Sequence, residues 1–96
     1  MTNPVLQADQ RYVWHPFTQH AWWPDDDPLV ITGGQGVWLQ DSDGQRYIDA
    51  FSSLWVTVHG HNEPRITAAI TAQAQTLDHS TFLGFPHEPR VRLAQA

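Results

Sequence analysis

The architecture of this chain can be read from residues 29–49, which have the sequence LVITGGQGVWLQDSDGQRYID. Three short runs within it, Leu29–Ile31, Val37–Gln40 and Arg46–Asp49, have the composition of β-strands. The link between the second and third runs, Asp41–Gln45, is rich in turn formers and has Gly44 where a positive φ angle is needed. The pattern predicts a small antiparallel meander.

Helical patterns flank the predicted meander on both sides. Residues 5–13 are predicted to form a short helix. We expect it to end before Pro16, because the residue before a proline avoids helical angles. Pro64 suits the first turn of a second helix, which apolar residues at helical spacing carry to about Leu77. A third helix, within residues 86–96, has no stop signal after it, so we expect the chain to be a piece of a longer polypeptide. The predicted fold class is α+β.

Composition and charge exclude several classes of function. The formal net charge is −5 and the five cationic side chains are spread along the chain, whereas nucleic-acid binding needs clustered cations. There is no cysteine, so disulfides and thiolate catalysis are excluded. No apolar run is long enough to span a membrane, and the N-terminus lacks the features of a signal peptide. We therefore expect a cytoplasmic protein.

Three motifs have the composition of functional sites without the required spacing. Gly33–Gly36 is followed by a strand-like run, whereas a phosphate-binding loop needs a helix there, so we interpret it as a turn. His59 and His61 could share a metal on one face of a strand, but Gly60 between them suggests a bend, and we assign no metal site. Asp78–Ser80 contains the residue types of a hydrolase triad, but adjacent residues cannot converge in that geometry.

The stretch after the third strand, Ser52–His61, is more informative. It places Leu54 and Trp55 beside hydroxyl and imidazole side chains at the end of the predicted sheet. Flat apolar walls with few polar groups suit a small-molecule pocket, although ordinary packing explains the same residues equally well. The five tryptophans of the chain leave the same two alternatives open, a core or subunit interface on one side and a ligand pocket on the other.

Three blocks of the sequence together resemble a known enzyme family. Residues 9–19, DQRYVWHPFTQ, resemble the opening signature of the diaminopelargonic acid aminotransferases. The run from Asp41 to Asp49, followed by Ser52–Trp55 and His59–His61, resembles a stretch shared by class III aminotransferases of fold type I. Residues 79–84, HSTFLG, again resemble the diaminopelargonate branch. The resemblance covers nearly the whole chain.

This resemblance implies a fold, a cofactor and a reaction. Family members are homodimers with an α/β large domain that binds pyridoxal 5'-phosphate (PLP) and a smaller domain that includes the N-terminus. The family moves an amino group from S-adenosylmethionine, or from lysine in some members, onto 8-amino-7-oxononanoate and forms 7,8-diaminopelargonic acid for biotin synthesis. The resemblance implies that residues 1–96 are the N-terminal segment, which is the small-domain part and runs into the start of the large domain, without a complete catalytic domain.

The resemblance also implies a set of substrate-binding residues. The aromatic residue after His15-Pro16 belongs to the substrate and donor pocket, and it is Phe17 here where family members often have tyrosine. The two residues after Ser52-Ser53 line the substrate site and are Leu54 and Trp55 here. Two further aromatic residues, in the loop after the long helix, are expected to close the pocket from this subunit or its partner: Phe82 and Phe85.

The absence of lysine limits what these residues can do. A PLP enzyme holds its cofactor covalently on a lysine amine, and none of the 96 residues is lysine. We therefore assign no catalytic and no cofactor-binding residue to this chain and expect it to be inactive alone. Two other hypotheses remain: a different class III ω-aminotransferase, which the Trp14-His15-Pro16 block disfavours, and a non-catalytic, tryptophan-rich interaction domain.

Overall fold

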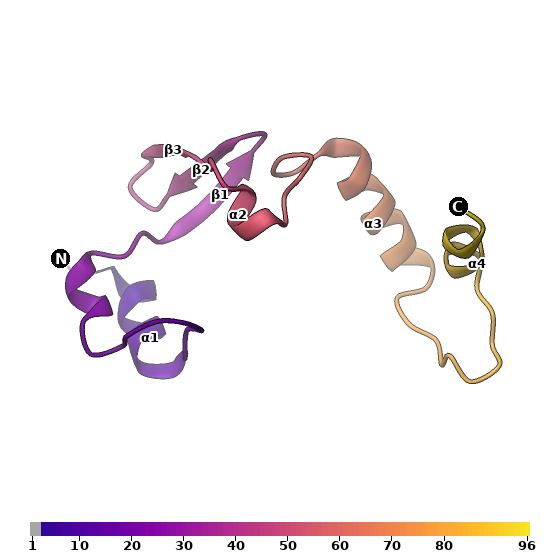
Figure 1. Ribbon diagram of the computed structural model, residues 1–96, viewed down its shortest axis with the longest axis horizontal. Helices are drawn as coiled ribbons and strands as arrows, with labels where there is room; N and C mark the ends of the chain where they lie inside the picture. The colour runs from indigo at the N-terminus through magenta and orange to yellow at the C-terminus, as the bar shows by residue number, and fades with distance from the viewer. Residues whose placement is uncertain (1–2) are drawn as a thin grey trace. The chain divides into compact units, whose positions relative to one another are not determined.

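A computed structural model describes residues 3–96 of the chain. These residues form two units, one ending at Glu63 and the other spanning Pro64–Ala96. The first unit contains a helix, a 3₁₀ turn, a three-stranded sheet and a single helical turn, and the second contains two helices (Figure 1). The boundary at Pro64 was not predicted from the sequence.

The sheet is the predicted antiparallel meander. Its strands are β1 (Ile31–Gln35), β2 (Trp38–Asp41) and β3 (Arg46–Ile48), in the order β1-β2-β3 (Figure 1). Gln35 pairs with Trp38 across the first turn, where Gly36 has a φ angle of +58°. The predicted position of the first strand was wrong, because β1 begins at Ile31 and includes two glycines that we had assigned to a turn.

The second turn of the meander is organised by the carboxylate of Asp41. Its Oδ1 accepts hydrogen bonds from the backbone N–H groups of Asp43 (2.9 Å) and Gln45 (2.8 Å), and its Oδ2 accepts one from the Tyr47 hydroxyl (2.8 Å). Burial raises the pKa of Asp41, but these hydrogen bonds outweigh burial and leave the pKa below its ordinary value of 3.8. Gly44 supplies the positive φ angle, +81°, as predicted.

The N-terminal helix α1 spans Pro4–Tyr12, close to the predicted range. Its start is capped by Asn3, whose Oδ1 accepts a hydrogen bond from the Val5 backbone, and Asn3 Nδ2 also donates to Ser42 Oγ in the β2–β3 turn. A 3₁₀ helix, η1 (Trp23–Asp26), follows in a segment for which the sequence analysis predicts no regular element. The sequence signal for it is the proline in its first turn.

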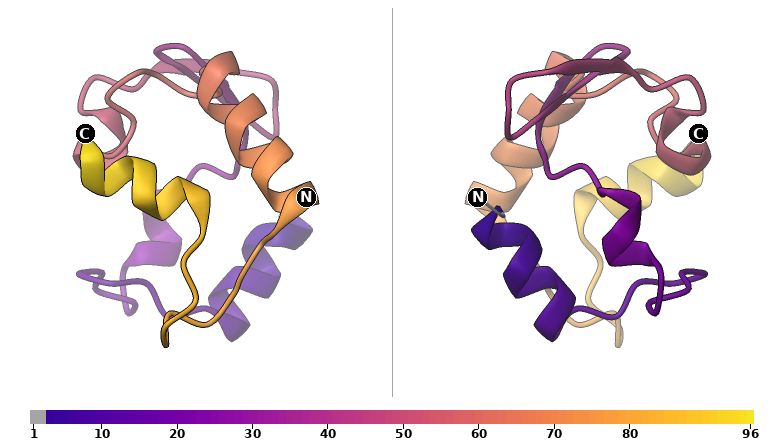
Figure 2. Two further views of the ribbon diagram at one scale, coloured as in Figure 1. Left: turned by 90° about the vertical axis from the view of Figure 1, so that its right-hand side faces the viewer. Right: turned by 90° about the vertical axis from the view of Figure 1, so that its left-hand side faces the viewer.

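The second unit consists of helix α3 (Pro64–Thr76), the loop that follows it, and helix α4 (Glu88–Gln95), all visible in Figure 2. Both helices were predicted. The apolar face expected for α3 is present, but Ile66 and Ile70 on that face are 46% and 65% exposed. Within the chain described here, the apolar face of α3 is therefore not covered.

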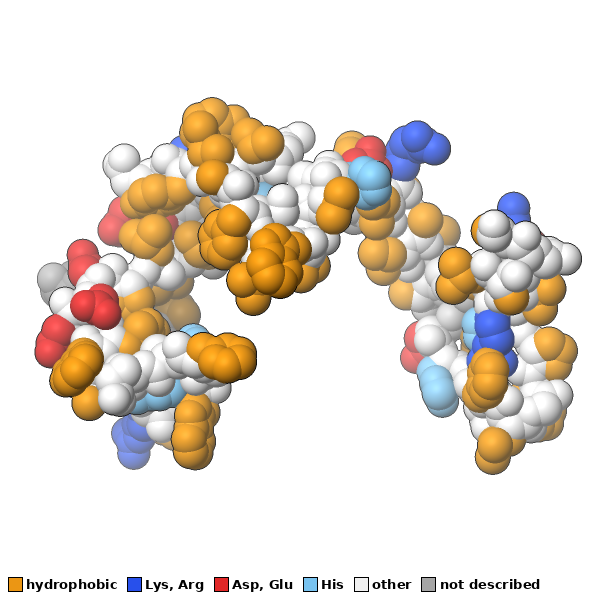
Figure 3. Space-filling model, viewed as in Figure 1, with side chains coloured by type: hydrophobic (Ala, Val, Ile, Leu, Met, Phe, Trp, Pro, Cys, Tyr) orange, Lys and Arg blue, Asp and Glu red, His pale blue; other side chains and the backbone are white. Residues whose placement is uncertain are grey.

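Uncovered apolar side chains are found throughout both units (Figure 3). Among the residues whose burial the structure describes, no hydrophobic side chain is buried, and Asp41 is the buried polar residue. Isolated domains of similar size bury roughly two-thirds of the surface that their unfolded chains expose. Within each unit, hydrogen bonds rather than a buried hydrophobic core are therefore the main contacts. In residues 3–96 we also find no helix with the length and apolar character needed to cross a membrane.

Candidate functional site

The residues expected to line the substrate site, Leu54 and Trp55, lie in an unusual helical turn, α2 (Ser52–Trp55). All four residues of α2 have positive φ angles, between +48° and +70°, so the turn is left-handed. The Trp55 and Val56 backbone N–H groups donate to the carbonyls of Phe51 (2.9 Å) and Ser52 (2.8 Å). The left-handed conformation costs roughly 1–2 kcal/mol for each residue other than glycine, so other contacts must stabilise α2.

The two apolar side chains of α2 are exposed to solvent. Leu54 is 62% exposed and Trp55 is 80% exposed. Neither side chain packs into a core of this unit, which contains no buried hydrophobic residue among those whose burial is described. Both are therefore available to contact a ligand or another part of a larger protein, and this exposure is compatible with the predicted role of a substrate wall.

The carboxylate of Asp49 is the main contact that holds α2. Asp49 follows β3, and its Oδ1 accepts a hydrogen bond from the Ser53 backbone N–H at 2.9 Å. Its Oδ2 accepts from Ser53 Oγ at 2.6 Å and lies 2.7 Å from His61 Nε2. The side chain of Asp49 is only 1% exposed. The carboxylate thus connects the sheet, the middle of the left-handed turn and the segment that follows it.

The protonation state of this cluster follows from the same contacts. The Ser53 hydroxyl, the Ser53 backbone N–H and the His61 ring lower the pKa of Asp49 to about 2, although burial opposes them. Asp49 is therefore ionised at neutral pH. Because an ionised carboxylate can only accept hydrogen bonds, the Nε2 atom of His61 must carry a proton.

His61 is in turn fixed to the sheet by the glycines around it. Its backbone forms a two-bond bridge with Gly36, at 2.9 and 2.8 Å, and its ring lies against Gly34, where a Cβ atom would come within 3.0 Å of His61 Cγ. Gly60 has a φ angle of +85° and packs against the Gly36 backbone. The close approach of the two segments thus explains Gly34 and Gly60, while Gly36 has a positive φ angle of its own.

These contacts also bear on the pair His59 and His61. The Nε2 atom of His61 is engaged with Asp49, and the residues that the structure describes contain no group of three or more histidine, cysteine or acidic side chains arranged for a metal. The bend expected at Gly60 is present. The contact of this segment with Asp49 was not predicted from the sequence.

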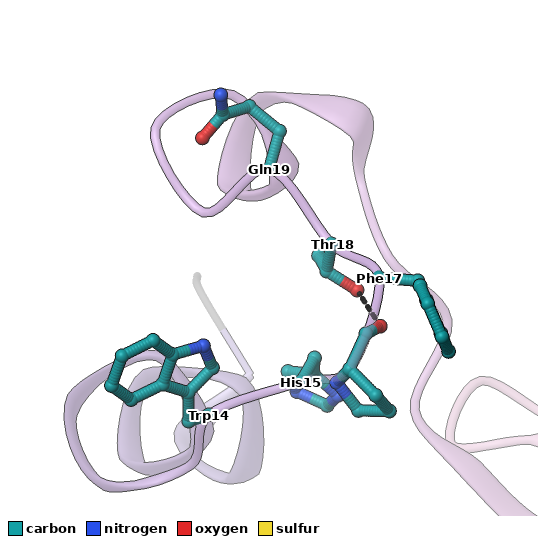
Figure 4. Close-up of a pocket in the computed structure, with 6 residues that line it drawn as sticks. Trp14, His15, Phe17, Thr18 and Gln19 are labelled. Carbon is teal, nitrogen blue, oxygen red and sulfur yellow. Dashed lines mark hydrogen bonds between the residues drawn. The ribbon is translucent and has the colours of Figure 1, made fainter.

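Phe17 lies in a second element of the first unit, the loop Trp14–Gln19. This loop lines an open cavity of about 500 Å³ (Figure 4). Phe17 has a φ angle of +49° and is fully exposed, and its ring and that of Trp14 point away from each other in Figure 4. The Thr18 hydroxyl donates to the Pro16 carbonyl at 2.8 Å and closes the turn at Phe17.

A cluster of polar and aromatic groups from α1 and η1 contacts this loop and its flanking residues. His15 Nε2 lies 2.7 Å from Asp9 Oδ2 on α1, and the His15 backbone N–H donates to His20 Nε2 at 2.9 Å. The ring of Trp23 lies 4.7 Å from the His15 ring, centroid to centroid. His15 of the Trp-His-Pro block therefore has a structural function, which is to fix the loop that carries Phe17.

The remaining predicted site residues, Phe82 and Phe85, lie in the loop of the second unit and are 70% and 64% exposed. Both contact Arg90 of α4. The Arg90 guanidinium carbon is 3.5 Å from the centroid of the Phe82 ring, and Nη1 donates to the Phe85 carbonyl at 3.4 Å. Arg90 was not identified from the sequence, where nothing distinguishes it from the neighbouring Arg92.

The structure thus distributes the five predicted site residues over three elements. Leu54 and Trp55 are adjacent on α2, Phe17 is on the Trp14–Gln19 loop of the same unit, and the other two are in the second unit. Leu54 and Trp55 are not among the residues that line the cavity at Phe17. Their shared role in one pocket stays a prediction.

Comparison with known proteins identifies relatives over nearly the whole chain. The family model described as Aminotransferase class-III matches residues 21–96. The adenosylmethionine-8-amino-7-oxononanoate aminotransferase of Geobacter sulfurreducens is 45% identical over 94 residues, which are 98% of this chain and 21% of that protein. The chain therefore spans about a fifth of the length of this relative.

Solved structures agree with the sequence comparison. The crystal structure of the enzyme of the same name from Methanocaldococcus jannaschii superimposes on 95% of this chain and 21% of its own, with a TM-score of 0.91 and 38% identity. An (S)-enantioselective omega-transaminase from Thermomicrobium roseum covers 94% of this chain and 20% of its own, with a TM-score of 0.85 and 32% identity. The predicted fold, an N-terminal part of a transaminase, is confirmed.

Proposed function

Because the chain belongs to the class III aminotransferase family, we propose that residues 1–96 form the N-terminal segment of a diaminopelargonic acid aminotransferase. The complete enzyme transfers an amino group from S-adenosylmethionine, or from lysine, to 8-amino-7-oxononanoate and forms 7,8-diaminopelargonic acid. This is the amino-transfer step of biotin synthesis. The similarity to relatives that bear the name of this enzyme is the main support for the choice of substrate.

In this proposal the chain contributes part of the substrate pocket. The observation that carries it is the left-handed turn α2, which displays Leu54 and Trp55 at 62% and 80% exposure from a backbone fixed by a buried carboxylate. An exposed leucine and tryptophan side by side suit the aliphatic chain of a long keto acid. Phe17 offers an aromatic face for an adenine or an aliphatic chain, and such stacking contributes about 0.5–1.5 kcal/mol beyond burial.

Phe82 and Phe85 belong to the same proposal as residues that close the pocket. Arg90 contacts the face of the Phe82 ring and the Phe85 carbonyl, so the loop is ordered from within its own unit. An ordered aromatic loop is suited to cover a bound substrate and exclude water from it.

The proposal includes PLP as cofactor, but this chain's residues do not fit its covalent attachment. None of the 96 residues is lysine, and no other side chain here can replace that amine. In this proposal the lysine comes from the four-fifths of the relatives' length that lies outside their match to this chain. We therefore assign no step of the amino transfer to these residues. The complete enzyme is proposed to be a cytoplasmic homodimer that acts on small molecules.

The test is an amino-transfer assay on the full-length gene product. With S-adenosylmethionine as donor and 8-amino-7-oxononanoate as acceptor, we expect formation of the diamine, measured by mass spectrometry. Replacing the donor by lysine in a parallel reaction identifies the donor. Failure to aminate the keto acid with either donor would contradict the proposal.

A second candidate is an ω-aminotransferase of the same family, which the similarity to the Thermomicrobium enzyme supports. Its identity to this chain, 32%, is lower than the 38% of the Methanocaldococcus enzyme, as is its TM-score. The same assay separates the two functions when an ω-amino acid or a diamine is offered as donor with a small keto acid as acceptor. Activity restricted to this pair would favour the second candidate.

A further inference from the structure

The left-handed turn α2 contains no glycine, in contrast to three nearby turns in which glycine occupies a positive φ angle. The meander turns have Gly36 and Gly44 at their positive φ angles, and the bend before His61 has Gly60. In α2 the same backbone region is occupied by Ser52, Ser53, Leu54 and Trp55 in succession. Glycine would adopt this conformation without strain, but at two of these positions it would delete a displayed side chain.

The strained backbone conformation of α2 is stabilised by residues that precede and follow it in the sequence. Asp49 precedes the turn and contacts Ser53 through one backbone and one side-chain hydrogen bond, at 2.9 and 2.6 Å. His61 follows the turn, contacts Asp49 at 2.7 Å and is bridged to Gly36 beside the sheet. A backbone conformation that local propensity disfavours persists where surrounding contacts determine it, and such positions occur at ligand sites.

From this arrangement we propose that Asp49, supported by His61, is a positioning residue for substrate binding: it holds α2 left-handed so that Leu54 and Trp55 face the keto acid. The inference rests on the proposed function. In this proposal Asp49 acts through the backbone and hydroxyl of Ser53 and not by direct contact with the substrate.

The experiment uses four variants of the full-length enzyme. Asp49→Asn removes the charge, and Ser53→Ala removes the hydroxyl while keeping the Cβ atom that disfavours a left-handed residue. Ser53→Gly removes the same hydroxyl and also relieves the strain. Asp41→Asn is the matched control, because the Asp41 carboxylate is also shielded from solvent and also has three hydrogen-bond partners, two backbone N–H groups and a hydroxyl, but lies in the β2–β3 turn.

Each variant is measured for the KM of the keto acid, for kcat, for PLP content and for Tm. We expect Asp49→Asn to raise the KM about tenfold, the effect of losing a charge-assisted hydrogen bond, with a smaller change in kcat. Apolar side chains that contact the substrate equally in the ground state and in the transition state affect KM and not kcat. This explains why the KM is expected to change more than kcat. Ser53→Ala raises KM more than Ser53→Gly does, and Asp41→Asn lowers Tm without changing KM.

The outcomes separate this inference from the proposed function. Wild-type enzyme that does not aminate the keto acid overturns both. Active wild-type enzyme together with an unchanged KM in Asp49→Asn, or with equal KM values for Ser53→Ala and Ser53→Gly, overturns the inference alone. If Asp49→Asn does not fold, the comparison of the two Ser53 variants decides the question.

Discussion

His61 Nε2 lies 2.7 Å from Asp49 Oδ2, and this contact joins the end of the sheet to the segment that follows the left-handed turn. The side chain of Asp49 is nearly inaccessible to solvent, and the same oxygen also accepts a hydrogen bond from the Ser53 hydroxyl. The geometry of residues 49–61 therefore depends on a carboxylate that is ionised and on three donor groups from two residues, Ser53 and His61.

The first prediction concerns acid stability. The pKa of Asp49 is about 2 in the folded chain and 3.8 for an ordinary aspartate, so the folded state binds the proton more weakly than the unfolded state. The stabilisation is complete above about pH 4 and is lost as the pH falls through 2. Acid titration of the full-length enzyme, followed by circular dichroism, should show this loss in wild type and not in Asp49→Asn. Identical titration curves would contradict it.

The second prediction concerns the approach of Gly60 to Gly36. A Cβ atom on Gly60 would lie 3.1 Å from Gly36 backbone atoms at a φ angle of +85°, so Gly60→Ala is strained and crowded. We expect a loss of about 2 kcal/mol or more in the free energy of unfolding. Gly33→Ala is the control, because a Cβ atom there meets nothing within 4 Å. Equal effects of the two substitutions in thermal unfolding would refute this account of Gly60.

A third prediction tests whether Trp55 is a substrate-site residue. Trp55→Ala in the full-length enzyme should reduce kcat/KM for the keto acid by about tenfold, the loss of an aromatic stacking contact, and change Tm little. Trp22→Ala is the control, since Trp22 is also exposed, at 69%, and has no proposed role in binding. Parallel losses of Tm and kcat/KM in Trp55→Ala would instead make Trp55 a packing residue.

The fourth prediction concerns the contact between Arg90 and Phe82. A guanidinium over an aromatic face contributes about 0.5–1 kcal/mol at exposed sites, and lysine does not reproduce its planar stacking. A double-mutant cycle with Arg90→Lys and Phe82→Leu, measured as free energies of unfolding of the full-length enzyme, should therefore give a coupling free energy of that size. Arg92→Lys should show no coupling to Phe82, because Arg92 pairs with Glu88 in an exposed contact of 3.4 Å. A coupling near zero for Arg90 would mean that the stacking does not order the loop.

The fifth prediction concerns the 96-residue polypeptide by itself. No hydrophobic residue is buried among those whose burial the structure describes. Hydrogen bonds alone cannot offset the conformational entropy that is lost on folding. We expect a broad, non-cooperative thermal transition by circular dichroism and strong binding of a hydrophobic dye. A sharp two-state transition at micromolar concentration would show that the units cover their apolar faces in a way not seen here.

Much of the architecture follows from local sequence. The β2–β3 turn needs only Asp41 and Gly44, and α3 needs only Pro64 and an apolar face at helical spacing, so both were predicted. The position of β1 was missed because glycine has low strand propensity, and at Gly34 it is present to admit the His61 ring. Of the candidate site, the displayed residues Leu54 and Trp55 could be named from the sequence, whereas Asp49, Ser53 and Arg90 could not.

Family membership, the meander, the long helix and the lack of a lysine anchor are properties of the residues and their spacing, and they were available without coordinates. The left-handed turn was not, because four successive residues other than glycine do not favour that conformation by themselves. Only the folded chain brings Asp49 and His61 together around Ser53, and only their hydrogen bonds make the strained backbone the stable one. The orientation of Leu54 and Trp55 is thus a consequence of tertiary contacts.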